Sequence, residues 1–122
     1  DGFIMLSYRF ISNFELRQFN NIMDLAVPYA VGTTLLFSLD DKAVGYICYE
    51  GTSSYIMNFE VFKPFRGKGY SKIMFKHFIN AIRPYNNIVQ LRPLDDSLKK
   101  YYVKLGFVND GDKMNYDLNK RI

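Results

Sequence analysis

Hydrophobic and polar residues alternate at the start of the chain and then change to a helical spacing. Residues from Phe3 to Ile11 alternate and are rich in aromatic and β-branched side chains, which predicts a strand. Ser12 and Asn13 follow with side-chain oxygens that can cap a helix. From Phe14 to Val27 the apolar residues recur every three or four positions, which predicts an amphipathic helix that stops before Pro28. The chain is therefore expected to open with a strand and one helix.

The middle of the chain predicts three strands in series. Strand-like runs cover Thr34 to Leu39, Ala43 to Glu50 and Tyr55 to Phe62. A compact hairpin signal, Asp40 to Lys42, joins the first two runs, and a turn from Gly51 to Ser54 joins the second and third. Short connections of this kind favour an antiparallel meander.

The second half predicts a strand between two helices, and then a hairpin. A turn rich in glycine and charge, Lys63 to Gly69, precedes a helix whose apolar stripe runs from Ile73 to Ile82 and which ends at Arg83 and Pro84. The remaining elements are a short apolar strand at 88–91, a helix at 98–105 capped by residues 95–97 and closed by Gly106, and a hairpin of 107–108 with 114–118.

Composition indicates one domain covering residues 1–122. The chain is 48% hydrophobic and 17% aromatic, so a single core can form without disulfides or metal. Cys48 and His77 are the only residues of their types, which excludes an intramolecular disulfide and a structural zinc cluster, and no metal site is predicted. Because no apolar run approaches the roughly 20 residues of a membrane span and no secretory signal is present, we expect a cytoplasmic protein without a membrane partner. Since the first residue is not Met, native residues are expected ahead of Asp1.

The positive charge of the chain gathers around the glycine-rich turn. The net charge is +4, which suits an anionic ligand but is far below what nucleic-acid binding alone requires. Arg66, Lys68, Lys72 and Lys76 surround the point where a strand runs into a helix. Backbone N–H groups and the positive end of the helix dipole converge at such a point and bind phosphate without metal. The spacing of glycines excludes a P-loop and a dinucleotide fingerprint, although a solvated turn is the alternative reading.

Two segments resemble the GNAT superfamily of acetyl-coenzyme A dependent N-acetyltransferases. Arg66, Gly69 and Ser71 fill the defined places of the family's signature Arg/Gln-x-x-Gly-x-Gly/Ala, with Ser in place of the usual small residue. The later run from Tyr102 to Phe107 is similar to the family's Tyr-x-x-x-Gly-Phe ending. The resemblance covers essentially the whole chain and implies one α/β (α+β) domain. Its sheet would be mixed and mostly antiparallel, with a splayed parallel strand pair and helices on both faces.

The resemblance also implies acetyl-CoA as cosubstrate and a set of residues that bind it. The main chain of the third meander strand would pair with the pantetheine arm, and the amides of the turn would hold the pyrophosphate. The implied binding residues are Val61, Phe62, Arg66, Gly67, Lys68, Gly69, Tyr70 and Ser71.

Catalytic roles follow from the same resemblance. Tyr102 is the expected general acid for the leaving thiolate, because it occupies the tyrosine position of the family ending. Tyr101 beside it is expected to pack as an ordinary helix aromatic, and Arg92 to be solvated. Glu60 is the candidate general base because it is nearest in sequence to the cofactor edge, although strand alternation puts it on the face opposite Phe59 and Val61.

Three functions remain open at this point. The first is acetyl transfer from acetyl-CoA to a primary amine by direct attack in a ternary complex. The second is a non-catalytic acyl-CoA-binding or regulatory module, and the third, less favoured, is an acetyltransferase that acts on aminoacyl-tRNA. The acceptor, a small molecule or a peptide amine, would be bound by loops at 28–33, 94–97 and 109–113 that match no specificity signature. The family also implies that the chain can form a homodimer.

Overall fold

The structure is a computed structural model that describes residues 5–27 and 32–119. The predicted start of the first strand at Phe3 and Ile4, and the loop residues 28–31, lie outside this part. Twelve elements follow one another along the described chain: β1 (Ser7–Ile11), α1 (Asn13–Leu16), η1 (Arg17–Ile22), β2 (Thr33–Leu39), β3 (Lys42–Glu50), β4 (Tyr55–Val61), η2 (Lys63–Phe65), α2 (Tyr70–Ile82), β5 (Ile88–Leu91), α3 (Asp96–Leu105), β6 (Val108–Asp110) and β7 (Lys113–Asp117).

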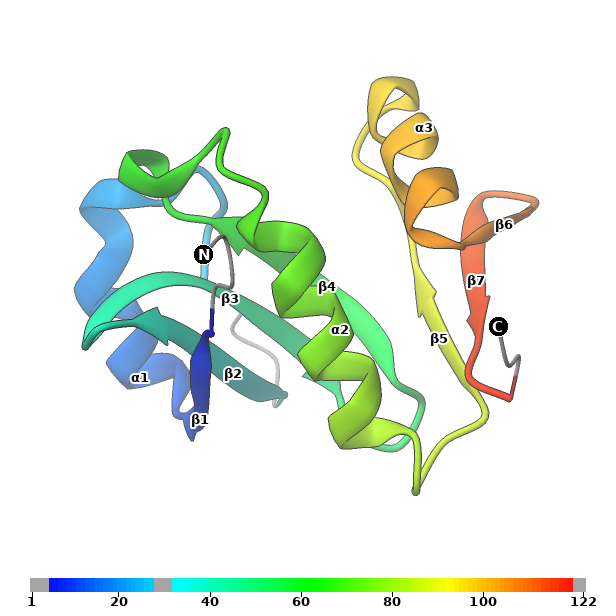
Figure 1. Ribbon diagram of the computed structural model, residues 1–122. Helices are drawn as coiled ribbons and strands as arrows, with labels where there is room; N and C mark the ends of the chain where they lie inside the picture. Colours follow the sequence, from blue (N-terminus) through cyan, green and yellow to red (C-terminus); the bar gives the residue numbers. More distant parts are fainter. Residues whose placement is uncertain (1–4, 28–31, 120–122) are drawn as a thin grey trace.

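The strands form one seven-stranded sheet in the order β1-β2-β3-β4-β5-β7-β6 (Figure 1). β2, β3 and β4 form the antiparallel meander that their short connections predicted. β1 adds a further antiparallel strand at the free edge of β2. β4 and β5 are the parallel pair, with α2 as the crossover between them. The prediction of a single α/β (α+β) domain with a mixed, mostly antiparallel sheet is confirmed.

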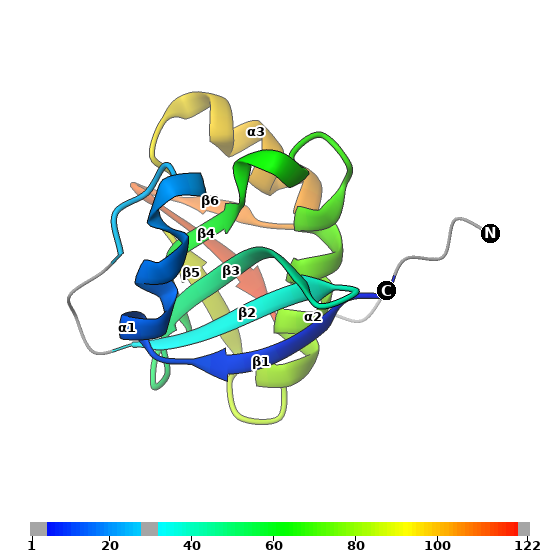
Figure 2. The same cartoon turned by 90° about the vertical axis from the view of Figure 1, so that its left-hand side faces the viewer.

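Helices cover both faces of the sheet. Figure 2 shows α2 on one face and α1 on the other. Two hydrophobic clusters correspond to these faces: the larger lies under α2 and includes Met74, Phe75 and Phe78, and the smaller includes Leu16 and Phe62. α3 packs on the side of the larger cluster through Tyr102 and other residues. Within the described residues, none of the helices combines the length and the apolar character needed to cross a bilayer.

The predicted helix from Phe14 to Val27 is only partly present: an α-helix covers Asn13–Leu16, and Arg17–Ile22 form a 3-10 helix. Ser12 caps α1 as expected, its Oγ accepting the N–H of Glu15 at 3.0 Å. The helical path continues only to Ile22, and residues 23–27 adopt neither helix nor strand. The reason is a contact from outside the segment, because the carboxylate of Glu60 accepts hydrogen bonds from the main-chain N–H groups at positions 24 and 25. We call residues 23–27 the docked segment.

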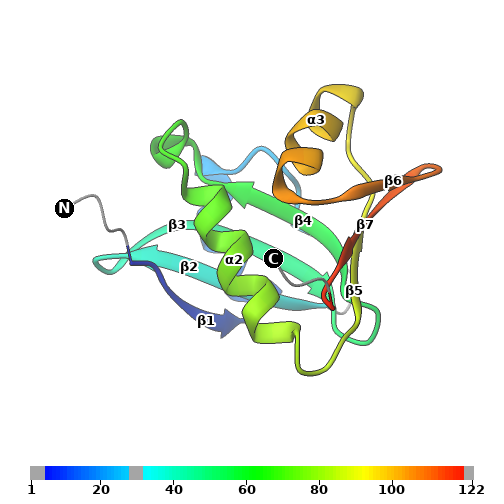
Figure 3. The same ribbon diagram turned by 45° about the vertical axis from the view of Figure 1, so that its right-hand side comes forward.

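β4 and β5 separate soon after they meet. Their parallel pairing is confined to Tyr55 with Gln90 and Ile56 with Leu91. Figure 3 shows the two strands diverging beyond this point, with α3 above the opening. A register shift between Cys48 and Tyr49 of β3 marks a bulge at Met57, so β4 bends near the place where it leaves β5. The second half of β4 therefore has a partner strand on one edge only.

Candidate active site

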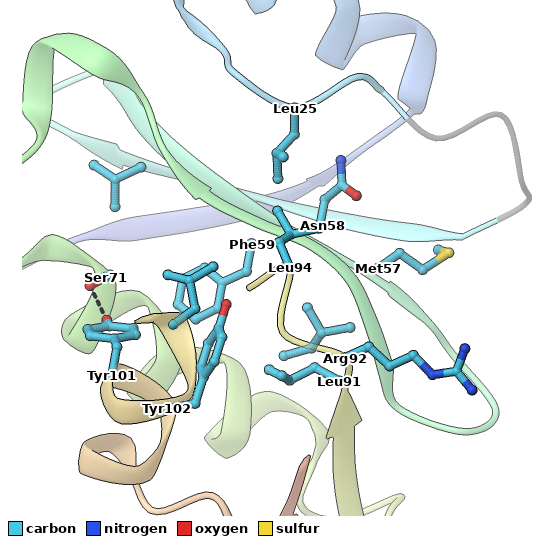
Figure 4. A pocket seen from close by; sticks show the side chains of 13 residues that line it. Leu25, Met57, Asn58, Phe59, Ser71, Leu91, Arg92, Leu94, Tyr101 and Tyr102 are labelled. Carbon is cyan, nitrogen blue, oxygen red and sulfur yellow. Dashed lines mark hydrogen bonds between the residues drawn. The ribbon is translucent and has the colours of Figure 1, made fainter. Parts of the chain in front are cut away.

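A cavity of about 310 Å³ lies where β4 and β5 separate. Figure 4 shows Ser71 and Tyr101 at one end, Arg92 and Met57 at the other, and Tyr102 between them. The first we call the turn end and the second the far end. The cavity is lined by Leu25, Ile56, Met57, Asn58, Phe59, Val61, Ser71, Leu91, Arg92, Leu94, Leu98, Tyr101 and Tyr102.

The open edge of β4 presents main-chain groups to this cavity. Phe62 N–H donates to the carbonyl of Val44 on β3 at 2.8 Å, which fixes the alternation of the strand. It follows that Phe59 and Val61 direct their N–H and C=O groups away from β3, toward the gap. The Val61 carbonyl accepts from Arg66 Nε at 2.9 Å, which leaves the Val61 N–H and both groups of Phe59 without a sheet partner.

The prediction that Phe62 offers its main chain to a cofactor needs correction. Its N–H is bonded to Val44, and its carbonyl accepts the N–H of Phe65 at 2.9 Å. Its side chain is fully buried in the smaller cluster. Phe59, two residues before Val61, lies on the same edge and has the unpaired main-chain groups that the sequence had led us to expect at Phe62.

The turn before α2 has open main-chain amides. Gly67 and Gly69 have φ angles of 78° and 81°, which other residues adopt only with strain, and a Cβ at either position would meet no atom within 4 Å. Among the described residues, no carbonyl accepts from the N–H groups of Gly69, Tyr70 or Ser71. These amides stand at the positive end of a 13-residue helix. The geometry is that of an anion site, with the Tyr70 ring buried beneath as its anchor.

The charges of the turn divide into paired and unpaired groups. Arg66, predicted as an anion ligand, uses its guanidinium internally: it bonds Asp24 at 2.7 Å and Glu60 at 2.9 Å. Hydrogen bonds from Arg66 and Lys63 hold the pKa of the Asp24 carboxyl below its ordinary value. Lys68 and Lys72 are exposed, and neither has an ion-pair partner among the described residues. These two lysines are therefore the cations available to an anion at the turn.

Glu60 is a buried carboxylate that does not line the cavity. It accepts hydrogen bonds from the N–H groups of Asp24 at 2.5 Å and Leu25 at 3.2 Å, from Arg66 at 2.9 Å and from the Tyr46 hydroxyl at 3.4 Å. It lies on the face opposite Phe59 and Val61, as the alternation of the strand indicated. Nothing in this geometry brings the carboxylate to a substrate, and its role as a base stays a prediction.

Tyr102 comes from α3 and stands in the middle of the cavity. Its ring packs against Phe59 and Phe107, and Figure 4 shows its hydroxyl directed into the cavity. Burial raises the pKa of the Tyr102 phenol to about 12, so the hydroxyl keeps its proton at neutral pH. The helix stops at Gly106, with φ 115°, where a Cβ would lie 2.8 Å from the ring of Tyr116. The glycine of the Tyr-x-x-x-Gly-Phe run thus allows this sheet contact while the helix carries Tyr102 inward.

Tyr101 has a role that the sequence did not reveal. Its hydroxyl is hydrogen-bonded to Ser71 Oγ, which links α3 to the first turn of α2 (Figure 4). Both residues line the cavity, so the expectation that Tyr101 packs as an ordinary aromatic is wrong. Adjacent tyrosines before the glycine were the only available signal, because Tyr101 and Ser71 are 30 positions apart in the sequence.

The far end of the cavity is mostly apolar with one charge. Within residues 5–27 and 32–119, Arg92 is the only charged residue that lines the cavity. Its side chain is 60% exposed, as the sequence predicted, and it forms a loose, exposed ion pair with Asp112 at 3.4 Å. Leu25 of the docked segment and Leu94 provide apolar wall, and Asn58 provides an amide. Of the loops expected to bind an acceptor, the described parts contribute Leu94.

The sequence matches one known protein family over most of its length. A comparison with protein-family profiles matches the acetyltransferase (GNAT) domain over residues 9–117. A search of curated protein sequences gives no match.

Solved structures share the fold at low sequence identity. The ribosomal-protein-S18-alanine N-acetyltransferase of Escherichia coli aligns with a TM-score of 0.75 at 11% identity, over 97% of each chain. A chimera of the spermidine N-acetyltransferase SpeG of Vibrio cholerae and hSSAT aligns with a TM-score of 0.72 at 12% identity, over 93% of this chain and 95% of the other. A protein from Bacillus anthracis, provisionally named a streptothricin acetyltransferase and solved with acetyl coenzyme A, gives 0.61 at 18% identity, over 81% and 67%.

Proposed function

This chain belongs to the GNAT acetyltransferase family, and on that premise we propose that it transfers the acetyl group of acetyl-CoA to a primary amine within a ternary complex. The observation that carries the proposal is the continuity of two unpaired sets of main-chain groups. The edge of β4 at Phe59 and Val61 runs into the turn whose amides at Gly69, Tyr70 and Ser71 have no internal acceptor among the described residues.

These groups fit the two parts of a coenzyme A molecule. The amide-containing pantetheine arm needs strand-like partners, which the unpaired groups of Phe59 and Val61 supply. The pyrophosphate needs several N–H donors and positive charge, which the turn and the exposed Lys68 and Lys72 supply. The open space at Gly67 and Gly69 lets a ligand approach the backbone closely. The solved Bacillus anthracis neighbour, which contains acetyl coenzyme A, supports the same cosubstrate here.

Tyr102 is the residue that we assign to proton transfer. Bound acetyl-CoA supplies an acetyl group that is already activated as a thioester. Tyr102 gives its proton to the departing thiolate sulfur as the bond from nitrogen to the acetyl carbon forms and the carbon–sulfur bond breaks. Burial raises the pKa of Tyr102 to about 12, so its phenolate is a strong base. Tyr102 then recovers a proton from the acetylated nitrogen, and no net proton is released.

Because the Tyr102 phenolate takes the proton from the acetylated nitrogen, a separate carboxylate base is less needed. In the part of the chain that the structure describes, no Asp or Glu lines the cavity. The amine must therefore arrive in its neutral form, either from solution or after losing a proton to water. Holding it against the thioester at one site supplies much of the acceleration, because the two reactants are brought together in fixed geometry.

The amine enters at the far end of the cavity in this proposal. The turn end is taken by the coenzyme, and the opposite end carries Arg92 and Met57, with the apolar Leu25 and Leu94 between the two ends (Figure 4). A lone arginine repels polycations and attracts a carboxylate. The acceptor we propose is thus a small molecule or peptide amine that is neutral or carries a negative group near the nitrogen. A polyamine such as the substrate named for the Vibrio cholerae neighbour suits this end poorly.

A two-step experiment tests the function. Thermal-shift measurements with acetyl-CoA, longer acyl-CoAs and CoA come first, because a ligand that binds the folded state raises the melting temperature. Release of free thiol is then followed with an amine panel that includes amino acids, their amides, peptides and spermidine. Binding followed by thiol release supports the proposal. Tight binding without release on any amine favours a non-catalytic acyl-CoA module, and the lack of any shift rejects the coenzyme.

A further inference from the structure

A network of charged side chains joins the turn to the docked segment. Arg66 stands at its centre and makes three different contacts: Nε donates to the carbonyl of Val61, and the two terminal nitrogens donate to Asp24 and Glu60. Lys63 adds a second cation beside Asp24 at 3.3 Å. One guanidinium therefore contacts the end of β4, a buried carboxylate and the docked segment together.

Glu60 directs all its hydrogen bonds into this network. Its side chain is only 6% exposed. An ionised carboxylate has about four acceptor sites, and here four donors reach it: Arg66, Tyr46 and the N–H groups of Asp24 and Leu25. A buried charge is tolerated when it is paired and hydrogen-bonded in this way. The same bonds give the docked segment two of its main-chain partners.

The docked segment is held by side chains from β4 and from the residues that follow it, and not by secondary structure. Besides Glu60, Asn58 Nδ2 donates to the Ala26 carbonyl at 2.9 Å and to the Tyr46 hydroxyl at 3.1 Å. Leu25 extends from this segment toward the cavity (Figure 4). A shift of the segment would therefore move part of the cavity wall and leave the amides of the turn in place.

We propose that Glu60 and Arg66 are positioning residues for the amine acceptor. Their ion pair fixes the docked segment as the amine-side wall and connects that wall to the turn where the coenzyme binds. This inference rests on the acetyl transfer proposed above, and it gives Glu60 a positioning role in place of the proton-accepting one. Because Arg66 also begins the turn, a bound coenzyme restrains it and thereby stiffens the docked segment. By linkage, a bound amine must then strengthen coenzyme binding equally.

Amide hydrogen exchange tests the positioning without any need for activity. In the wild-type protein, the N–H groups of Asp24 and Leu25 should exchange slowly although they lie outside helix and strand, and CoA should slow them further. Glu60→Gln places an amide among the donors, so exchange at both positions should rise about tenfold and lose its response to CoA. The matched control is Glu50→Gln, which removes an exposed carboxylate whose bonds go to Thr52 and Ser53. It should change neither amide.

Steady-state kinetics separate a positioning residue from a base. In Glu60→Gln, the KM for the amine should rise about tenfold, while kcat and the Kd of CoA stay within about threefold. The pH profile of kcat should keep its acid limb. A large fall in kcat with the acid limb lost and the amine KM unchanged is the signature of a base, and it overturns the proposal.

A second variant tests the proposal if Glu60→Gln does not fold. Asp24 is 53% exposed, so Asp24→Asn can be made without emptying a buried site. Asp24→Asn should change the same quantities as Glu60→Gln by smaller factors, with a rise of about threefold in the KM for the amine. Unchanged exchange at positions 24 and 25 in folded Glu60→Gln overturns the proposal, as does an unchanged amine KM in both variants. If the wild-type protein binds CoA but acetylates no amine, the proposed function fails, and the exchange data still decide the positioning role.

Discussion

The turn before α2 and the end of β4 are neighbouring stretches that differ in hydrogen bonding: within the described chain, the polar groups of the turn are unpaired, and those at the end of β4 are paired. At the turn, the amides of Gly69, Tyr70 and Ser71 have no acceptor among the described residues, and Lys68 and Lys72 have no ion-pair partner there. A few residues earlier, at the end of β4, the situation is reversed. There the buried carboxylate of Glu60 receives donors from Arg66, Tyr46 and two main-chain amides. Arg66 lies between the two stretches and belongs to the saturated one.

The difference shows which groups are available to a ligand. Unpaired donors at a helix N-terminus gain most when an anion arrives, because they have no bond to give up. Saturated groups gain nothing from a ligand unless an internal bond breaks first, so their contribution is the shape they maintain. Proximity to a cleft along the sequence therefore did not suffice to identify a catalytic carboxylate. It is the hydrogen-bond inventory that separates the ligand-binding turn from the positioning network.

The largest expected effect is at Tyr102, which stands in the cavity between its turn end and its far end. Tyr102→Phe removes the hydroxyl from the cavity and keeps the ring against Phe59 and Phe107. We expect kcat to fall about 100-fold, the size typical of a lost acid–base group, with the Kd of acetyl-CoA within about threefold. Thiol-release assays measure kcat, and calorimetry measures the Kd of acetyl-CoA. Tyr85→Phe, at an 84% exposed position, is the control. Equal loss of affinity and rate would make Tyr102 a binding residue.

The next effect concerns the open turn alone. Gly69→Ala introduces a Cβ at φ 81° into the space where the coenzyme phosphates are proposed to lie. We expect the Kd of CoA to rise about tenfold and the stability to fall by about 1 kcal/mol. Gly111→Ala is a matched control, with φ 66° and equally open surroundings in the final hairpin. It should cost the same stability without weakening CoA. If both variants bind CoA like the wild type, the turn is not the anion site.

Alkaline pH tests the burial of three tyrosines outside the two stretches: Tyr102 on α3, and Tyr46 and Tyr49 on β3. Burial raises the pKa of Tyr102 to about 12, and burial also raises the pKa of Tyr46 and Tyr49. An unfolded tyrosine titrates near pH 10, so the unfolded state loses these protons first. The stability they contribute is thus complete below about pH 10 and is lost as the pH rises toward about 12. Urea unfolding across this pH range should show a fall in the free energy of unfolding. In Tyr102→Phe that fall should be smaller by about 1 kcal/mol. An identical loss in that variant would show that Tyr102 is not shielded from solvent.

The smallest effect is expected at the far end. Arg92 is 60% exposed, and its ion pair with Asp112 is loose. Arg92→Gln should lower the preference for an amino acid over its amide by about threefold, as expected for an exposed charge. The kcat/KM ratio of the two acceptors measures it, and Lys42→Gln, which removes an exposed charge at the start of β3, serves as the control. A ratio that is the same in all three proteins would remove Arg92 from acceptor selection.

Local signals predicted most of the fold. The cap at Ser12, the αL residue Gly106 and the short turns of the meander each act within a few residues, and each is present in the structure. The helix does not reach Val27 as predicted, because the main-chain N–H groups of Asp24 and Leu25 donate to Glu60, more than 30 residues away in the sequence. Spacing of apolar residues gives no information on such a competitor.

The candidate site was predictable where its groups are adjacent in sequence. The turn before α2 and Tyr102 could be found because glycines, charges and the tyrosine–glycine spacing lie side by side in the chain. Phe62 was misassigned, because only the bond to Val44 shows which edge of β4 each residue faces. Leu25 and Tyr101 were missed because tertiary packing alone brings them to the cavity. Sequence reasoning also could not show that Arg66 is already paired.

The central claim is that the amides of the turn bind the pyrophosphate of coenzyme A. An amide NMR titration of the protein with CoA tests it at single residues. We expect the largest chemical-shift changes at Gly69, Tyr70 and Ser71, and no change at Gly111, which serves as an internal reference. Saturable binding with unchanged resonances at these three residues, or no binding at millimolar CoA, would contradict it.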